Sequence, residues 1–528
     1  MPVSFGQIPN DVLLPLFYAE IVAAPEPIQP ALTICLVGSA NQGPGYDEGT
    51  HTPNMPHLLT GDNAKELFGR GSMLWRMYEF CRSNAPFAEI WGVAVPSNLD
   101  DPNTLNQPFR ATAKIKVVKG GSKTFFGTGV IFVEGIPCQF SVQKTDTPAT
   151  IATRLRAALN DVPHGAVASY DPEDATKTTI LLTMRYPGAV GDWVKVSHVG
   201  CRGRSTLHEA PVKIGRTCLR ITKGMGGGSG ENSPTACFAM LQDRPFDVFV
   251  YGYFGDPFWF RAEDFMDHAS GRWAPNRQMY GHAFTGSPPT PLSRQIELFD
   301  MMDDPHMSVV SFKQSVIPPW LFASALGGVA ATHWSGPPEL SRPLQTLELR
   351  NCCVGDEDNE SWSRLEKTAL LRRGATTFTV QDDYSCRIDR VRTTRKKNLW
   401  GDTDWAWADA ITMFQAQYFV RSMRSRIRGA YPRCALSTLP TGINGFTSPV
   451  EIRSLVIHEY KRLASVGLVE NVDLFSRYLV VERNPFDRNR VDVLMRPDFV
   501  NQLRVVAALV ETHLELDATD PTLIAQAA

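Results

Sequence analysis

The feature that most constrains the fold is an alternation of strand and helix patterns that stops near residue 107 and resumes near residue 232. Before the break, residues 31–39 and 88–96 form apolar, strand-like runs, and amphipathic patterns over 62–68 and 72–82 lie between them. Continuous apolar strands separated by such helices are typical of a parallel sheet covered on both faces. The pattern predicts one parallel α/β domain that an insertion splits in two.

The alternation continues after the break in the same style. Strand-like runs occupy 247–254, 279–286 and 307–312, with helical patterns between them, and a further helical pattern covers 319–332. A hairpin-like pair of strands then follows, turning at Asp382 and Asp383. This second part completes the predicted α/β domain.

The insertion and the C-terminal region have other patterns. Residues 107–231 are rich in short strand patterns, with one helix over 148–159 that Thr147 caps. From residue 395, two helices are expected, and then two strands joined by a turn over 484–489. The predicted class is an α/β multidomain protein with an inserted β-rich domain and an α+β C-terminal domain. The domains expected are an extended arm over 1–30, a split α/β domain over 31–106 and 232–394, the insertion over 107–231, and a C-terminal domain over 395–528.

Composition excludes several classes of protein. The chain has 528 residues and a formal net charge of −2, which argues against a nucleic-acid binder and against a disordered chain. Its longest apolar run, over 321–332, is too short to span a membrane. The ten cysteines form no C-x-x-C pair, and we expect them to be reduced, mostly buried thiols.

Motifs for catalysis or cofactor binding are incomplete or missing. The glycine-rich stretch 37–45 lacks the Gly-Lys-Ser/Thr of a P-loop, and the sequence has no G-x-S-x-G and no H-E-x-x-H. His282 and His333 follow structured segments, where polar plugs at element ends are the ordinary explanation. Asp303 and Asp304 could hold a metal, but turns use the same residues. We therefore expect no catalytic residues, no cofactor and no metal site.

The two ends of the chain raise the question of partners. No Lys or Arg precedes Lys65, although six acidic residues do, whereas four arginines crowd a predicted helix at 421, 424, 426 and 428. Opposite charges in one chain suggest contact between copies, and two unrelated solvated faces are the alternative. The chain also finishes on an apolar, strand-like segment, whose backbone groups need a partner from the same chain or from a neighbour.

Six segments together resemble the contractile tail sheath proteins of Mu-like phages and related contractile injection systems. The resemblance runs in order along the chain and is looser only in the insertion. The matching segments are 3–20, 67–95, 281–286, 341–349, 365–394 and 467–516.

The resemblance implies a structural, non-enzymatic protein of a virion tail, assembled in the cytoplasm of a host bacterium. Its subunits would form six-membered rings stacked helically around a tail tube, with baseplate and tail terminator proteins as further partners, and without nucleic acid or membrane insertion. The split α/β domain would have a non-catalytic, subtilisin-like fold, and the insertion would face outward.

In such sheaths, the N-terminal arm and the C-terminal strand each add a strand to a sheet of a neighbouring subunit. This implies inter-subunit linking by Leu13, Leu14, Leu16, Phe17, Tyr18, Val22, Leu503, Val505, Ala507, Leu509, Leu514 and Leu516. The arginines at 421, 424, 426 and 428 would face the tube or a neighbouring subunit. Two other functions stay open: an α/β hydrolase-like enzyme, and a tube-forming or shell-forming protein unrelated to tails.

Overall fold

The computed structural model describes residues 32–41, 48–61, 63–96, 109–123, 125–198, 214, 216–230, 233–353, 361–398 and 400–510. The chain divides into two compact units. The first unit comprises residues 1–340 and 344–421, and the second comprises 341–343 and 422–528. The described residues contain helices and several separate sheets, so the mixed α/β class expected from the sequence is confirmed.

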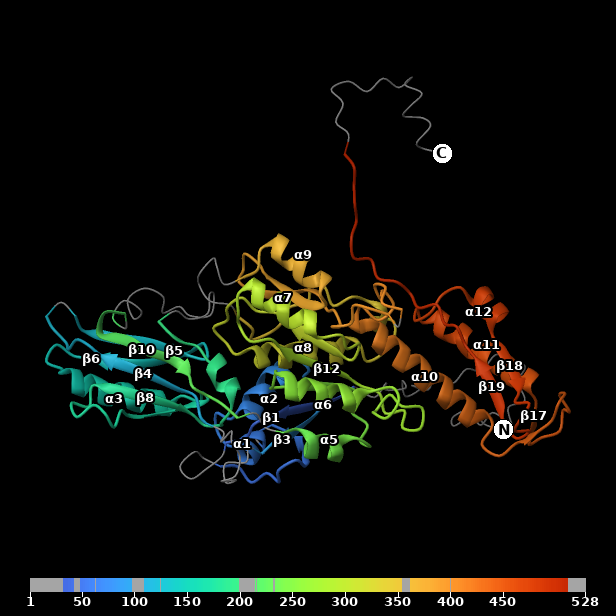
Figure 1. The fold of residues 1–528 in the computed structure, drawn as a ribbon, viewed down its shortest axis with the longest axis horizontal. Coiled ribbons are helices and arrows are strands. Elements are labelled where there is room, and N and C mark those ends of the chain that lie inside the picture. Colours follow the sequence, from blue (N-terminus) through green and yellow to red (C-terminus); the bar gives the residue numbers. More distant parts are fainter. Residues whose placement is uncertain are drawn as a thin grey trace, which may run out of the picture. The chain divides into compact units, whose positions relative to one another are not determined.

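A large, mostly parallel sheet forms the centre of the first unit (Figure 1). Its strand order is β15-β14-β13-β12-β11-β1-β3-β2, with β2 and β15 as antiparallel edge strands. The strands are β1 (Thr33–Gly38), β2 (Pro56–Leu59), β3 (Glu89–Ala94), β11 (Val248–Tyr251), β12 (His282–Gly286), β13 (Met307–Val310), β14 (Ala375–Val380) and β15 (Cys386–Arg390). Strands from before and after the sequence break therefore lie in one sheet, as the alternation predicts.

Helices cover both faces of this sheet. They are α1 (Asn63–Phe68), α2 (Met73–Asn84), α5 (Thr235–Leu241), α6 (Asp256–Met266), α7 (Leu292–Met301), α8 (Pro319–His333) and α9 (Arg364–Arg372). Strand β11 consists of apolar and aromatic residues because both its faces are covered: Phe249 and Tyr251 contact rings of α5 and α6, whereas Val250 lies against Gly327 of α8. Both faces of the strand are buried, which is the rule for parallel sheets.

Side-chain caps fix where several helices begin. Ser72 accepts a hydrogen bond from the backbone N–H of Trp75 and starts α2, as expected from the sequence.

Helix α8 is buried from Pro319 to Ala331, which explains the apolar run that is too short for a membrane span. Within the described residues, no helix combines the length and the apolar character that crossing a bilayer requires.

The insertion forms antiparallel sheets of its own, with α3 packed beside them (Figure 1). One sheet has the order β10-β4-β8-β7 and the other has the order β6-β5-β9. Thr147 caps α3, as predicted. The elements are β4 (Thr112–Val117), β5 (Gly127–Val133), β6 (Ile136–Val142), α3 (Pro148–Asp161), β7 (Ala166–Tyr170), β8 (Thr179–Met184), β9 (Val196–Ser197) and β10 (Leu219–Gly226).

Helix α10 (Ala410–Ala430) crosses the boundary between the two units. The sequence predicts that this helix begins at residue 405, but residues 406–408 form bends and Asp409 pairs with Arg392 instead. Thr393 donates its backbone N–H to Ala408, and Asp404 accepts two backbone N–H groups in a turn. Because Ala408 is paired with Thr393, the helix begins only at Ala410.

The second unit contains α11 (Pro449–Ser465), α12 (Val472–Tyr478) and two small two-stranded sheets. One sheet pairs β16 (Ala435–Leu436) with β17 (Phe446–Thr447), and the other pairs β18 (Val480–Arg483) with β19 (Val491–Leu494). The two units meet in sequence at residue 422, whereas the predicted C-terminal domain begins at 395. The four-part division of the chain stays a prediction.

The cysteines differ from expectation at one position. Among the cysteines in the described ranges, eight are free thiols, and seven of these are buried. Cys353 is disulfide-bonded, so the prediction that the cysteines are all reduced is wrong there.

Candidate assembly surfaces

A two-stranded hairpin in the second unit leaves its edges open. Strands β18 and β19 pair antiparallel, with Val481 opposite Val493, and no third strand joins them in the part of the chain described. Asn484 builds the turn by accepting backbone N–H groups from Phe486 and Asp487. An isolated two-stranded hairpin is marginally stable, and its outer edges present unpaired backbone groups. The hairpin is therefore a sheet that can accept a further strand.

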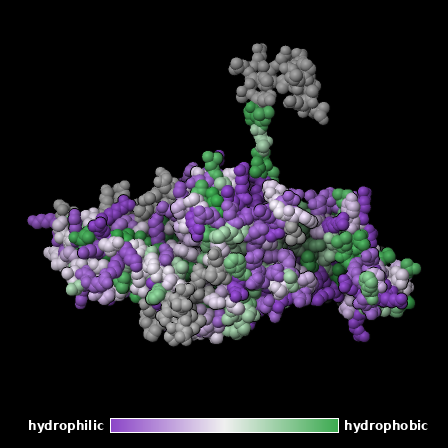
Figure 2. Space-filling model, viewed as in Figure 1, coloured by the Kyte–Doolittle hydropathy of each residue, from purple (hydrophilic) through white to green (hydrophobic). Residues whose placement is uncertain are grey.

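An apolar segment follows this hairpin. Residues 505–510 belong to no strand or helix, and their side chains are exposed, with Leu509 at 85% and Val505 at 80% exposure. Figure 2 shows this part of the chain as an exposed hydrophobic column. In an extended conformation, Val505, Ala507 and Leu509 lie on one face. Contiguous exposed apolar surface is uncommon on soluble proteins and is typical of interaction sites.

The structure describes only part of the predicted linking set. Leu503, Val505, Ala507 and Leu509 are exposed. Residues 13–22 of the arm, and Leu514 and Leu516, lie outside the described residues. The linking role of all these residues stays a prediction.

The four predicted basic residues do not share one environment. Arg421 is half-buried, forms an ion pair with Asp247 and donates to the carbonyl of Met279. It is thus occupied within its own unit, which differs from the expectation that it faces a partner. Arg426 and Arg428 are exposed and Arg424 is half-buried, and none of the three has an ion-pair partner among the described residues.

A serine and a histidine do meet inside the central sheet. His282 Nε2 lies 2.8 Å from Ser308 Oγ, and both side chains are buried. Burial lowers the pKa of His282 to about 3, and its Nδ1 has no hydrogen-bond partner within the described structure. A catalytic base needs an orienting partner and access to substrate. This pair, packed against Phe284 and Phe414, has neither in the described residues.

The junction of the insertion with α2 is polar. A cavity of about 440 Å³ is lined there by Arg76 and Glu134 among apolar neighbours. Burial raises the pKa of Glu134, and Arg76 Nε lies 3.8 Å from its carboxylate. Gly71 approaches the insertion so closely that a Cβ atom would lie 2.5 Å from the carbonyl oxygen of His164. These contacts attach the insertion to the sheet domain.

Asp303 and Asp304 are the acidic pair that, from the sequence, could hold a cation. Asp303 accepts the backbone N–H of Lys396 and pairs with Arg395. Among the described residues, no group of three histidine, cysteine or acidic side chains is arranged to hold a metal.

Sequence reasoning missed two features of these surfaces. It identified the β18–β19 strands but did not recognise the hairpin as an open acceptor sheet, because edge exposure depends on tertiary contacts. It also missed the Asp247–Arg421 pair, whose members are separated by 174 residues. No local pattern could have revealed that pair.

Comparison with known proteins finds a relative that matches nearly the whole chain. No protein-family model matches the chain. The chain is 26% identical over 529 residues to the Mu-like prophage FluMu tail sheath protein of Haemophilus influenzae, covering 97% of this chain and 99% of the relative.

Solved structures were also compared. A sheath tail protein from Desulfitobacterium hafniense has a TM-score of 0.45 at 12% identity, covering 92% of this chain and 100% of that one. One from Listeria innocua has a TM-score of 0.44 at 10% identity, covering 89% and 96%. The full-length sequence match confirms the resemblance noted from the sequence: over nearly its whole length, this chain is similar to a Mu-like prophage tail sheath protein.

Proposed function

We propose that this chain is a structural subunit of a contractile tail sheath. Copies polymerise into helically stacked six-membered rings around a tail tube, and contraction drives the tube through the envelope of a target cell. The observation that carries the proposal is the exposed apolar segment 505–510 in a unit that also contains a hairpin joined by no third described strand. The full-length similarity to a prophage tail sheath protein supports the same conclusion.

The link between copies is an added strand. The segment 505–510 of one copy pairs with the β18–β19 hairpin of another, and the N-terminal arm pairs in the same way. Pairing satisfies backbone N–H and C=O groups on both sides and buries apolar side chains. Because donor and acceptor surfaces differ, the contact is heterologous and repeats into a helix rather than closing as a dimer.

The free energies involved indicate that one such link between copies is weak. Burying Val505, Val506, Leu509 and Val510 contributes roughly 1.5–3 kcal/mol each at most, whereas ordering each residue of an extended segment costs about 1–2 kcal/mol. These two contributions nearly cancel, and the new backbone hydrogen bonds, about 0.5–1.5 kcal/mol each, decide the sign. Stable polymers therefore need many simultaneous links, so assembly is cooperative and depends on concentration.

The finer features follow from the same proposal. The split α/β unit is a non-catalytic, subtilisin-like fold, and the insertion faces outward. The tail tube, baseplate and tail terminator proteins are partners, and assembly takes place in the cytoplasm of the host bacterium. The exposed arginines of α10 lie toward the tube or a neighbouring copy. Contraction is a rigid-body rearrangement of subunits, with the added strands as tethers.

The test is electron microscopy of the purified chain at rising concentration. Hollow, cross-striated tubes are the expected result. Particles that stay monomeric even when a tail tube is supplied would contradict the proposal. A covalent fluorophosphonate label on a serine would favour the hydrolase reading, and unstriated shells or tubes that never contract would favour an unrelated assembly.

A further inference from the structure

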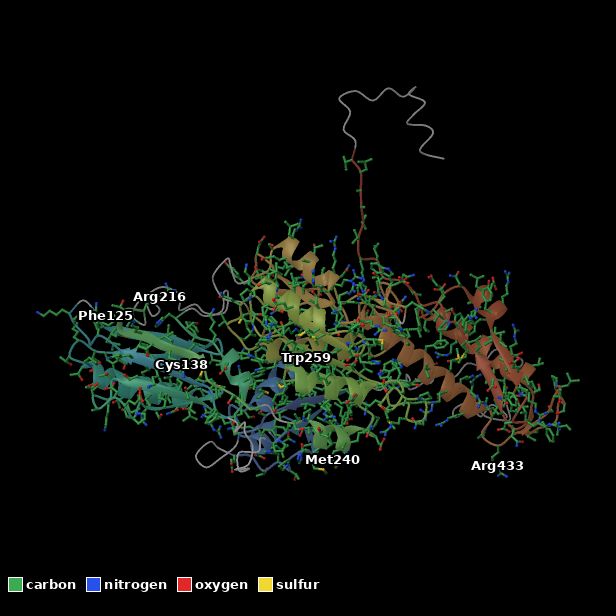
Figure 3. The ribbon with its side chains drawn as sticks, viewed as in Figure 1. Phe125, Cys138, Arg216, Met240, Trp259 and Arg433 are labelled. Carbon is green, nitrogen blue, oxygen red and sulfur yellow. The ribbon has the colours of Figure 1, made fainter. Side chains whose placement is uncertain are left out.

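A small acidic cavity opens on the first unit between α6 and the end of α7. Its volume is about 90 Å³, well above the roughly 10–15 Å³ that a single water requires. Three carboxylates line it, from Glu263, Asp303 and Asp304. Trp259, labelled in Figure 3, belongs to α6 and forms part of its apolar lining.

Two of the three carboxylates form no ion pair within the described residues. Asp304 is only 7% exposed, and its Oδ1 accepts the backbone N–H of His306 at 2.7 Å. Its Oδ2 is buried and has no hydrogen-bond partner in the part of the chain that the structure describes. Glu263 forms no ion pair among the described residues, whereas Asp303 is held by Arg395. Buried carboxylate oxygens are normally paired. Arg395 pairs with Asp303, so the orphaned oxygen of Asp304 and the carboxylate of Glu263 leave room for a further cationic group.

The rim of the cavity is apolar and open. Phe260 is 65% exposed and Met301 is 58% exposed, and both line the cavity with the carboxylates. Rings and thioethers at the mouth, with carboxylates within, match a side chain that has an aliphatic stem and a cationic head. A planar guanidinium also stacks on aromatic faces and pairs with carboxylates, which favours arginine over lysine.

We propose that this cavity binds an arginine from the last turns of α10 in a second copy of the chain. Arg424 and Arg428 are four residues apart on one helix face, and neither has an ion-pair partner within the described structure. Charge complementarity between an unpaired acidic cavity and these unpaired arginines selects this occupant. The pairing rests on the proposed function, which places copies of the chain side by side.

Neighbouring basic residues are less suitable. Arg426 is two residues from both Arg424 and Arg428, so it does not share their face of the helix. Arg421 is paired with Asp247. Arg433, labelled in Figure 3, comes after the helix has ended at Ala430. The Arg424–Arg428 face is thus the part of α10 that is available to a partner.

Charge reversal tests the pairing. Glu263→Arg, and separately the double change Arg424→Glu with Arg428→Glu, are each expected to raise the critical concentration for polymerisation at least tenfold, measured by light scattering and electron microscopy. The triple variant is expected to return to within threefold of the wild type, because opposite charges face each other again. Asp264→Arg is the control: it makes the same change of charge on the next residue of α6, outside the cavity lining.

The possible outcomes distinguish the proposed function from the pairing of the cavity with an arginine. Wild-type chain that never polymerises would overturn the proposed function and this pairing with it. Wild-type polymers with an unchanged critical concentration in Glu263→Arg would overturn the pairing alone. The pairing would also be overturned if the critical concentration rose in Glu263→Arg and the two arginine reversals did not lower it again. An equal rise in Asp264→Arg would overturn it too. Thermal unfolding of each purified variant confirms that the subunit is folded.

Discussion

Val481 of β18 lies directly opposite Val493 of β19, in a hairpin that no third described strand joins. Side chains of directly opposed residues share one face of a sheet, so this pair and the Val480–Leu494 pair lie on opposite faces. Val480 and Leu494 are among the exposed large apolar residues. A strand added at either edge would extend both faces. The edges of the hairpin therefore offer the backbone partners that the apolar segment 505–510 needs to form a strand.

Leu509→Asp is expected to abolish tube formation while leaving the subunit folded. The leucine is 85% exposed, so the substitution changes the free energy of unfolding by no more than about 0.5 kcal/mol. In an added strand the aspartate would be buried without a partner, which is strongly unfavourable. Thermal unfolding and electron microscopy of the same sample measure both effects.

Leu365→Asp is the matched control for that variant. Leu365 in α9 is exposed to the same extent, 85%, and carries the same side chain, but it lies outside the linking segment. Tubes should form as in the wild type. Equal loss of assembly in both variants would show that any exposed leucine matters, and would remove the special role of the segment.

Arg421→Ala is expected to destabilise the first unit. Asp247 is buried and accepts hydrogen bonds from Arg421, Gln417 and the backbone of Thr33. Losing one charged donor from a buried carboxylate costs about 1–3 kcal/mol, measured as a lower unfolding midpoint. Arg424→Ala, one helical turn on and without an ion pair, should change stability by less than about 0.5 kcal/mol. Equal effects of the two changes would contradict the structural role of Arg421.

Gly71→Ala is expected to weaken the attachment of the insertion. Gly71 has a φ of +76°, and an added Cβ atom would lie 2.5 Å from the carbonyl oxygen of His164. Gly61, with a φ of +51°, has open space at the same position, so Gly61→Ala measures the backbone strain alone, about 1–2 kcal/mol. Gly71→Ala should cost roughly 1–3 kcal/mol more, because overpacking adds to the strain. Similar unfolding midpoints for the two variants would rule out the close contact.

Asp304 is expected to make stability depend on pH. Burial raises its pKa to about 7, and the negative charges of Glu263 and Asp303 act in the same direction, against the hydrogen bond from His306 and the charge of Arg395. An unfolded aspartate titrates near 3.9, so between about pH 4 and 7 the folded state holds a proton that the unfolded state lacks. This contribution to stability is complete below about pH 4 and is lost as the pH rises to 7.

The variant Asp304→Asn isolates that contribution. Its carbonyl oxygen still accepts the N–H of His306, and it does not titrate. Between pH 5 and 7, wild-type stability should fall relative to the variant by up to about 1.4 kcal/mol per pH unit. Unfolding midpoints measured across that range give the difference. Parallel curves would show that Asp304 ionises as freely in the folded state as in the unfolded chain.

Much of the core was predictable because it depends on local periodicity. The apolar run that became β11 and the cap at Ser72 follow from residue spacing alone. The start of α10 was not predictable, because Thr393 pairs with Ala408 through contacts that no sequence window contains. The acidic cavity was only half predictable: Asp303 and Asp304 were visible as a pair, but Glu263 comes from another helix.

The most direct test of the account is a cryo-electron microscopy map of tubes formed by the wild-type chain. The account predicts that in each subunit the β18–β19 hairpin is extended by at least one strand from another copy, and that Val505 and Leu509 are buried there. A hairpin that remains two-stranded within the assembled tube, with residues 505–510 still exposed, would contradict it.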